Sequence, residues 1–152
     1  MSPAIASPRL VDLAQAHGVA TDYWDWHGEH VTVSAESIRA VLGALGIDVE
    51  DEVAVERALS DHEDAPWRRT LPATVVMREG WTPWVAAHVE AGTGIRLEVV
   101  LEDGTRRDVP QVDHRVPDRM VDGRAVGRAT FEVPGDLPAG WHRLVAHLDA
   151  PA

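Results

Sequence analysis

The spacing of apolar residues changes near Pro66, and this change limits the folds that the chain can adopt. Before it, apolar residues recur every three or four positions, which is the period of an amphipathic helix. After about residue 73, apolar and polar residues alternate, as they do in strands that bury one face. We therefore predict an α+β chain, with helices before about residue 66 and strands after about residue 73.

Three short helices are predicted in the first part of the chain. Ser7 and Ser34 are suitable N-caps, because a serine hydroxyl can accept a backbone N–H of the first turn. Gly18 and Gly46 suit the left-handed position that follows a helix end. Helices this short are marginal alone, so they are expected to pack on one another. The predicted helices span residues 8–17, 35–45 and 51–64.

The second part of the chain reads as a set of short strands. The Asp103-Gly104 pair between two of them is a hairpin signal. Strands of this number and spacing predict an antiparallel, immunoglobulin-like β-sandwich. The expected organisation is a helical subdomain over 1–66 and a sandwich domain over 67–152. The predicted strands span residues 74–77, 84–89, 95–101, 106–109, 125–133 and 141–148.

Length and composition exclude several classes of protein. A (β/α)8 barrel needs about 250 residues, whereas this chain has 152. Cysteine is absent, so disulfides and thiolate metal sites are excluded. No apolar run reaches the length of about 18 residues that a membrane helix needs, and no signal sequence is recognised. We expect a cytoplasmic protein that has no contact with a membrane.

The net charge bears on the choice of partner. The formal charge is -11, from 25 acidic residues and 14 basic ones, all of which are arginine. An acidic surface repels phosphate backbones, so nucleic acid is not expected as a ligand. A neutral sugar is compatible with this charge.

The six tryptophans are the candidate binding residues, since the chain has only one Tyr and one Phe. A flat indole ring can pack on the apolar face of a pyranose, but it can equally fill a core, and buried rings are commoner. Trp81 and Trp84 are the candidate substrate-binding pair, because a Gly and a Pro beside them predict an exposed loop. Trp24 and Trp26 form a second pair. Trp141 is expected to be a buried corner anchor.

Two polar clusters have alternative interpretations. His27 and His30 have the residue types of a zinc site, but they flank a glycine in a predicted turn and lack further ligands nearby. We expect two solvated loop histidines and no metal.

The acidic runs at 50–52 and 61–64 flank a short helix, where the helix dipole favours acids at the start. Neither run has the apolar setting of a glycosidase acid. No catalytic residue and no cofactor are predicted.

Two segments resemble the amino-terminal part of bacterial 4-alpha-glucanotransferases, the amylomaltases. The first is residues 13–46, LAQAHGVATDYWDWHGEHVTVSAESIRAVLGALG, and the second is residues 137–144, LPAGWHRL. Such enzymes transfer maltooligosaccharide segments between α-1,4-glucans on a large (β/α)8 barrel. The resemblance implies that an Asp nucleophile and a Glu acid/base lie on that barrel. None of these residues can be placed in this chain.

The resemblance leaves three hypotheses for the role of the chain. The leading one is a non-catalytic region that packs on, or assists, the catalytic barrel of the same polypeptide. The first alternative is a module that binds maltooligosaccharides or glucan through Trp81 and Trp84. The second alternative is a structural or dimerisation domain. The leading hypothesis predicts an exposed apolar patch where the barrel would sit, drawn from residues 23–26 or 81–84, and this patch should favour self-association.

Overall fold

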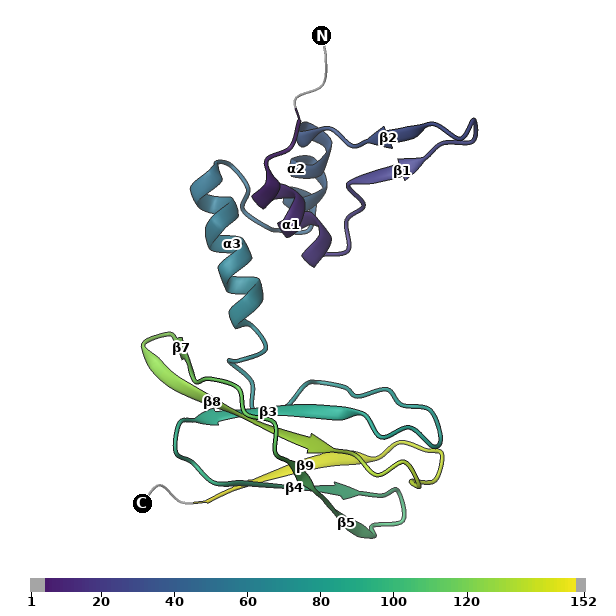
Figure 1. Cartoon of the computed structure of the whole chain (residues 1–152), viewed down its shortest axis with the longest axis vertical. Coiled ribbons are helices and arrows are strands. Elements are labelled where there is room, and N and C mark those ends of the chain that lie inside the picture. The colour runs from purple at the N-terminus through teal and green to yellow at the C-terminus, as the bar shows by residue number, and fades with distance from the viewer. Residues whose placement is uncertain (1–4, 150–152) are drawn as a thin grey trace. The chain divides into compact units, whose positions relative to one another are not determined.

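The structure is a computed structural model, and it describes residues 5–149. The chain divides into two compact units, the first ending at Asp64 and the second starting at Ala65. The first unit contains three helices and a short hairpin, and the regular elements of the second unit are all strands (Figure 1). Among residues 5–149, no helix is long and apolar enough to cross a membrane.

The three predicted helices are present in the first unit. They are α1 (Pro8–Ala16), α2 (Ala35–Ala44) and α3 (Glu52–Asp64). The hydroxyl of Ser7 accepts the N–H of Leu10 at 3.3 Å, and that of Ser34 accepts the N–H of Ser37 at 3.2 Å. Each cap therefore satisfies a donor that the helix itself leaves unpaired, which is worth about 1 kcal/mol.

A small apolar core holds the first unit together. Arg39 on α2 adds a polar link, because its guanidinium donates to the Val49 carbonyl oxygen and to Glu52 Oε1, the latter at 2.7 Å. Packing of these apolar faces, rather than helix propensity, stabilises helices of this length. The core consists of Leu10, Leu13, Ala14, Ile38, Leu42, Val49, Val55 and Leu59.

A two-stranded antiparallel hairpin lies between α1 and α2, so the prediction that all strands follow residue 73 is wrong. It consists of β1 (Asp22–Trp24) and β2 (His30–Thr32). The Asp25 carboxylate accepts the N–H groups of His27 and Glu29, each at 2.8 Å. Gly28 takes a φ of 81°. Strands of three residues are too short to show alternation, so turn chemistry defines this hairpin.

The second unit is a sandwich of two antiparallel sheets. The first sheet has the strand order β3–β8–β6, with β7 also paired to β8, and the second has the order β5–β4–β9. The strands are β3 (Trp84–Glu90), β4 (Ile95–Val100), β5 (Arg106–Val109), β6 (Gln111–Val112), β7 (Arg119–Val121), β8 (Arg124–Glu132) and β9 (Arg143–Leu148).

Alternating side chains from both sheets form the core of the sandwich. Val85 lies opposite Phe131 in the first sheet, and Leu97 lies opposite Val109 in the second. All four side chains are buried in one apolar cluster. The period of two in the sequence therefore reports the inward face of each strand. Three helices and two antiparallel sheets confirm the prediction of an α+β chain with a β-sandwich.

The expected strand at 74–77 is absent, although its side chains do alternate. Val75 and Met77 pack against the sandwich core, whereas Val76 is 88% exposed. The segment is extended but is not paired with a strand. Alternation shows which side chains share a face, and it does not show whether a neighbouring strand is available for hydrogen bonds.

One hairpin in the sandwich was not predicted. Strand β7 pairs with β8 through a two-residue turn formed by Asp122 and Gly123, whose φ values are 50° and 79°. Positive φ at both central positions is the pattern of a type I′ turn, for which Asp-Gly is a preferred sequence. The turn residues were therefore a usable signal, equivalent to the one at Asp103-Gly104.

Candidate functional site

Five of the six tryptophans are exposed, so core filling, the commoner role of such rings, does not account for most of them. A contiguous exposed apolar patch marks a surface that contacts something else, whereas single exposed rings are common. The sixth, Trp67, packs against the buried His88 with 4.6 Å between the ring centroids. The exposed fractions are 71% for Trp24, 88% for Trp26, 59% for Trp81, 55% for Trp84 and 88% for Trp141.

Trp81 lies on a turn just before β3. The backbone N–H of Trp81 donates to the Arg78 carbonyl oxygen at 3.1 Å, and the backbone N–H of Gly80 donates to the Gly135 carbonyl oxygen at 2.9 Å. The Arg78 guanidinium lies 5.3 Å from the centroid of the Trp81 ring, within the range of a cation–π contact. The ring is thus held on a fixed turn beside a cation.

Trp84 begins β3 and is oriented by its cross-strand partner. Its indole Nε1–H donates to Glu132 Oε2 at 2.9 Å, and the two residues are paired in the β3–β8 register. The ring centroid of His114 is 5.6 Å from that of Trp84. Within residues 5–149, no ring contact joins Trp84 to Trp81. The predicted pair is therefore exposed on one unit, but each ring has its own neighbours.

The β1–β2 hairpin carries the second group of exposed rings. Trp24 packs against His30 with 5.1 Å between centroids, and Trp26 packs against His27 at 3.4 Å. His30 Nε2 also lies 3.5 Å from the Asp22 carboxylate. In the part of the chain that the structure describes, no three His, Cys, Asp or Glu side chains converge as metal ligands would.

The prediction that Trp141 is a buried corner anchor is wrong. Its side chain is 88% exposed, and β9 begins two residues later. Its backbone N–H donates to Glu102 Oε1 at 3.0 Å, so the main chain rather than the ring is held. Leu137 is the member of this corner that enters the core. The motif at residues 137–144 predicts that an apolar residue anchors the corner, but it does not distinguish Leu137 from Trp141.

A cleft of about 440 Å³ opens beside Trp141 in the sandwich unit. Its floor is the apolar core, and the extended segment before residue 78 forms one side. None of its lining residues carries an aspartate, glutamate or arginine side chain. No pattern in the sequence predicted this cleft, because the cleft depends on an unpaired segment and an exposed ring. The lining residues are Ala73, Thr74, Val75, Val76, Met77, Val99, Val133, Leu137, Gly140, Trp141, His142 and Leu144.

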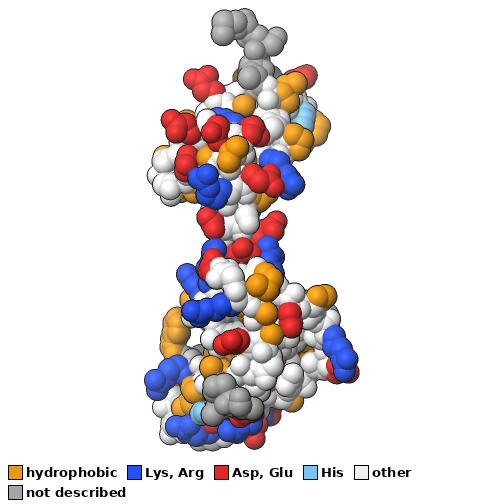
Figure 2. Space-filling view, turned by 90° about the vertical axis from the view of Figure 1, so that its left-hand side faces the viewer, with side chains coloured by type: hydrophobic (Ala, Val, Ile, Leu, Met, Phe, Trp, Pro, Cys, Tyr) orange, Lys and Arg blue, Asp and Glu red, His pale blue; other side chains and the backbone are white. Residues whose placement is uncertain are grey.

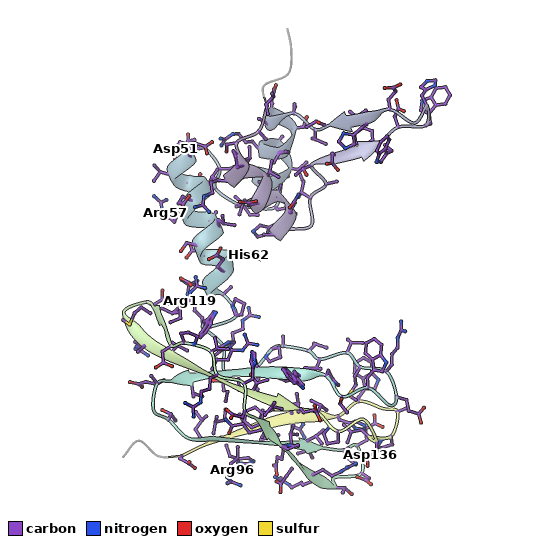
Figure 3. All side chains as sticks on the ribbon, in the orientation of Figure 1. Asp51, Arg57, His62, Arg96, Arg119 and Asp136 are labelled. Carbon is purple, nitrogen blue, oxygen red and sulfur yellow. The ribbon has the colours of Figure 1, made fainter. Side chains whose placement is uncertain are left out.

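The carboxyl groups with a shifted pKa are all held in the charged form. A hydrogen bond from His147 lowers the pKa of Glu98, and the Nε2–Oε1 distance is 3.0 Å. A hydrogen bond from Arg107, at 2.8 Å, lowers the pKa of Asp136. Asp136 is labelled on the sandwich unit in Figure 3. The Arg68 guanidinium has the same effect on Asp122. These carboxyls are structural ion pairs and lack the raised pKa of a general acid.

Comparison with known proteins identifies the family. The family model described as "MalQ N-terminal beta sandwich domain" matches residues 70–152, which is more than half of the chain. The chain belongs to this family. The resemblance found in residues 137–144 lies within this match, and the relatives described next, which cover most of the chain, confirm the resemblance as a whole.

Relatives named as 4-alpha-glucanotransferases match nearly the whole chain. A 4-alpha-glucanotransferase of Mycobacterium tuberculosis and one of Mycobacterium bovis are each 43% identical over 139 residues, 91% of this chain and 19% of theirs. The crystal structure of amylomaltase from Corynebacterium glutamicum matches with a TM-score of 0.86 and 38% identity, over 94% of this chain and 21% of that one. The chain spans about a fifth of the length of these relatives.

Proposed function

We propose that this chain is the non-catalytic amino-terminal region of a 4-alpha-glucanotransferase, and that it packs on and supports a catalytic barrel of the same polypeptide. The proposal rests on the share of each protein that is matched, because nearly all of this chain corresponds to a small part of its relatives. The mycobacterial 4-alpha-glucanotransferases match 91% of this chain with 19% of their own length. Transfer of maltooligosaccharide segments between α-1,4-glucans is then the task of the remaining part of such a protein.

The exposed rings of the hairpin support a packing role. Tyr23, Trp24 and Trp26 are exposed on the β1–β2 hairpin, whose turn Asp25 holds in place, so the rings are presented without much loss of entropy on docking. Interfaces within one chain bury about 600–1,500 Å², and aromatic rings contribute most to such contacts. Without a covering partner, the same rings favour self-association.

A second candidate function is glucan binding through Trp81 and Trp84. Both rings are exposed on the sandwich, and both are held by neighbours, Trp81 by its turn and Trp84 by Glu132. Pre-oriented rings suit the apolar faces of sugars because little rotamer entropy is lost on binding. This function is compatible with packing on a barrel, since the hairpin and the sandwich carry different rings.

The packing role is tested by mixing this chain with a C. glutamicum amylomaltase that lacks the 21% of its length matched here. We expect a stoichiometric complex in analytical ultracentrifugation, no glucose release from maltotriose by the chain alone, and a weaker complex with Trp24→Ala/Trp26→Ala. The double variant Trp81→Ala/Trp84→Ala serves as the matched control. Glucose release by the purified chain alone, or no complex at any concentration, would overturn the proposal.

A further inference from the structure

Residues 74–77 form an extended segment whose main chain has no partner among the residues that the structure describes. None of their backbone N–H or C=O groups forms a hydrogen bond to a residue between 5 and 149. Main-chain groups in folded proteins pair with other protein groups or with water. Because Thr74 and Val76 are exposed, the segment presents unpaired donors and acceptors at the surface, as an edge strand does.

Side chains hold this segment in its extended form. Val75 and Met77 pack against the sandwich core, and Val76 between them is 88% exposed. The cleft of about 440 Å³ beside Trp141 opens along the segment, so the segment is not covered from that side. A strand that is already extended loses little conformational entropy when another strand pairs with it. The segment is therefore preorganised for the addition of a strand.

The sequence of the segment lacks the usual protection of a sheet edge. Thr-Val-Val-Met contains no charge, proline or glycine, and its β-branched residues favour strands. Protective residues stand only beside it, at Pro72 and Arg78. By contrast, the outer strands β5 and β9 carry arginines, and β6 has two residues and follows Pro110. The segment is thus suited to pairing with another strand.

The charge around the segment is compatible with a second copy of the chain as the partner. Residues 65–152 contain twelve acidic residues and eleven arginines, so the formal charge of this unit is -1. The unit that would meet its copy therefore carries little net charge, although the whole chain carries -11. Antiparallel pairing of a strand with its own copy is also self-complementary, because a two-fold axis relates the two strands.

We propose that residues 74–78 pair antiparallel with the same residues of a second copy, and that the chain forms a weak two-fold dimer through this contact. The register centred on Val76 sets Val75 opposite the partner's Met77 and Thr74 opposite the partner's Arg78. Inward side chains then lie opposite inward side chains, as the alternation of a strand requires. The contact is smaller than a standard interface, so we expect a Kd between about 10 µM and 1 mM.

The test follows association and amide exchange of the whole chain together. Sedimentation velocity from about 10 µM to 1 mM should show a reversible equilibrium between monomer and dimer. Over the same range, hydrogen exchange at alternate amides of residues 74–77 should slow in proportion to the loss of monomer, because these amides acquire partners. Trp24→Ala/Trp26→Ala should leave this protection unchanged, since the hairpin rings are not part of the contact.

Variants at Val76 test the register. Val76→Lys and Val76→Glu each place like charges opposite one another across the two-fold axis, so each should raise the Kd about fivefold. An equimolar mixture of the two variants should associate more tightly than either variant alone, since Lys then lies opposite Glu. Val76 is exposed, so the melting temperature of each variant should stay near that of the wild-type chain. Val76→Thr, which keeps the β-branched shape, is the matched control and should keep the wild-type Kd.

Three results would overturn the assignment. One is a chain that stays monomeric at about 1 mM. Another is a dimer in which mixing the two charged variants restores nothing, because the segments of the two copies then do not meet. The third is protection of 74–77 that disappears in Trp24→Ala/Trp26→Ala, which would assign self-association to the hairpin rings.

The complex with the truncated amylomaltase separates this proposal from the packing role. If Val76→Lys weakens that complex and the chain alone is monomeric, the segment pairs with the remaining part of the protein and the second copy is wrong. A monomeric chain that forms the complex equally well with Val76→Lys loses only the strand pairing, and the packing role of the hairpin stands.

Discussion

The two units of this protein differ in their formal net charge. Residues 1–64 contain thirteen acidic residues and three arginines, whereas residues 65–152 contain twelve acidic residues and eleven arginines. The formal charges are therefore -10 and -1. Acidic side chains outnumber arginines on the helical unit, and both kinds are mixed on the sandwich (Figure 2). A net charge far from zero favours solubility, and the helical unit carries most of this charge.

The units also differ in what holds them together. The helical unit consists mainly of helices, whose hydrogen bonds join residues close in sequence, packed around a core of eight buried residues. The sandwich rests on strand pairs that are distant in sequence, such as β3 with β8 and β4 with β9. Pairings between segments distant in sequence are slower to form than local helices. We therefore expect the two units to respond separately to core substitutions.

Phe131→Ala should give the largest effect. Phe131 is fully buried between the sheets, and truncation of a core aromatic costs about 3–5 kcal/mol. Urea unfolding should show the loss in the sandwich transition, with the helical signal near 222 nm unfolding at its original concentration. A simultaneous loss of both signals would break the comparison, because it would mean that the units fold as one.

Leu13→Ala is the matching change in the helical unit. Leu13 is fully buried among the helices, and a Leu-to-Ala change in a core costs about 2–5 kcal/mol. A domain of about 60 residues has little stability to spare, so the far-UV helical signal should be lost while sandwich amides stay protected from hydrogen exchange. Retention of the helical signal at 25 °C with the wild-type midpoint would contradict this expectation.

Asp25→Ala should affect only the hairpin. It removes a carboxylate that accepts two backbone N–H groups at 2.8 Å, and an exposed pair of such bonds is worth about 1–2 kcal/mol. Amide exchange at His27 and Glu29 should accelerate, with the cores of both units unchanged. Glu29→Ala, at a neighbouring exposed position, is the control and should leave the exchange of these amides slow.

The free energy of unfolding should depend on pH through two histidines whose pKa is lowered in the folded state. Burial, and next the Arg128 charge, lower the pKa of His88 in the sandwich, and burial followed by His62 lowers that of His17 in the helical unit. Because both folded-state values lie below the unfolded value of about 6.5, stability is full above that pH and falls as the pH drops through the folded values.

The His88 contribution can be isolated by substitution. The sandwich transition of the wild-type chain should weaken as the pH falls below the unfolded-state value of about 6.5, and His88→Gln should show a shallower dependence over the same interval. A wild-type curve that is flat there, or that rises as the pH falls, would contradict the lowered pKa of His88.

Trp141→Ala should have the smallest effect on stability. The ring is 88% exposed, and surface changes of this kind alter the free energy of unfolding by less than about 0.5 kcal/mol. The contrast with Phe131→Ala, measured by the same urea titration, separates an exposed ring from a core ring. A loss as large as that of Phe131→Ala would mean that the indole is buried in solution.

The sequence was sufficient for the parts of the fold that follow from local patterns. Ser7 and Ser34 marked helix starts, and alternation around Val85 and Leu97 marked the inward faces of strands. It failed where the outcome depends on distant partners. Residues 74–77 alternate because Val75 and Met77 reach the core, yet no strand pairs with them. The exposure of Trp141 follows from Leu137 filling the corner, a choice of packing that the motif does not encode.

The most direct test of the central claim is a chimera. This chain replaces the matching 21% of C. glutamicum amylomaltase, and the melting temperature and glucose release from maltotriose are compared with those of the truncated and intact enzymes. If the chain is a packing region of a 4-alpha-glucanotransferase, the chimera should recover most of what truncation removes, and Trp24→Ala/Trp26→Ala within it should lower that recovery. A chimera that behaves like the truncated enzyme would contradict the account.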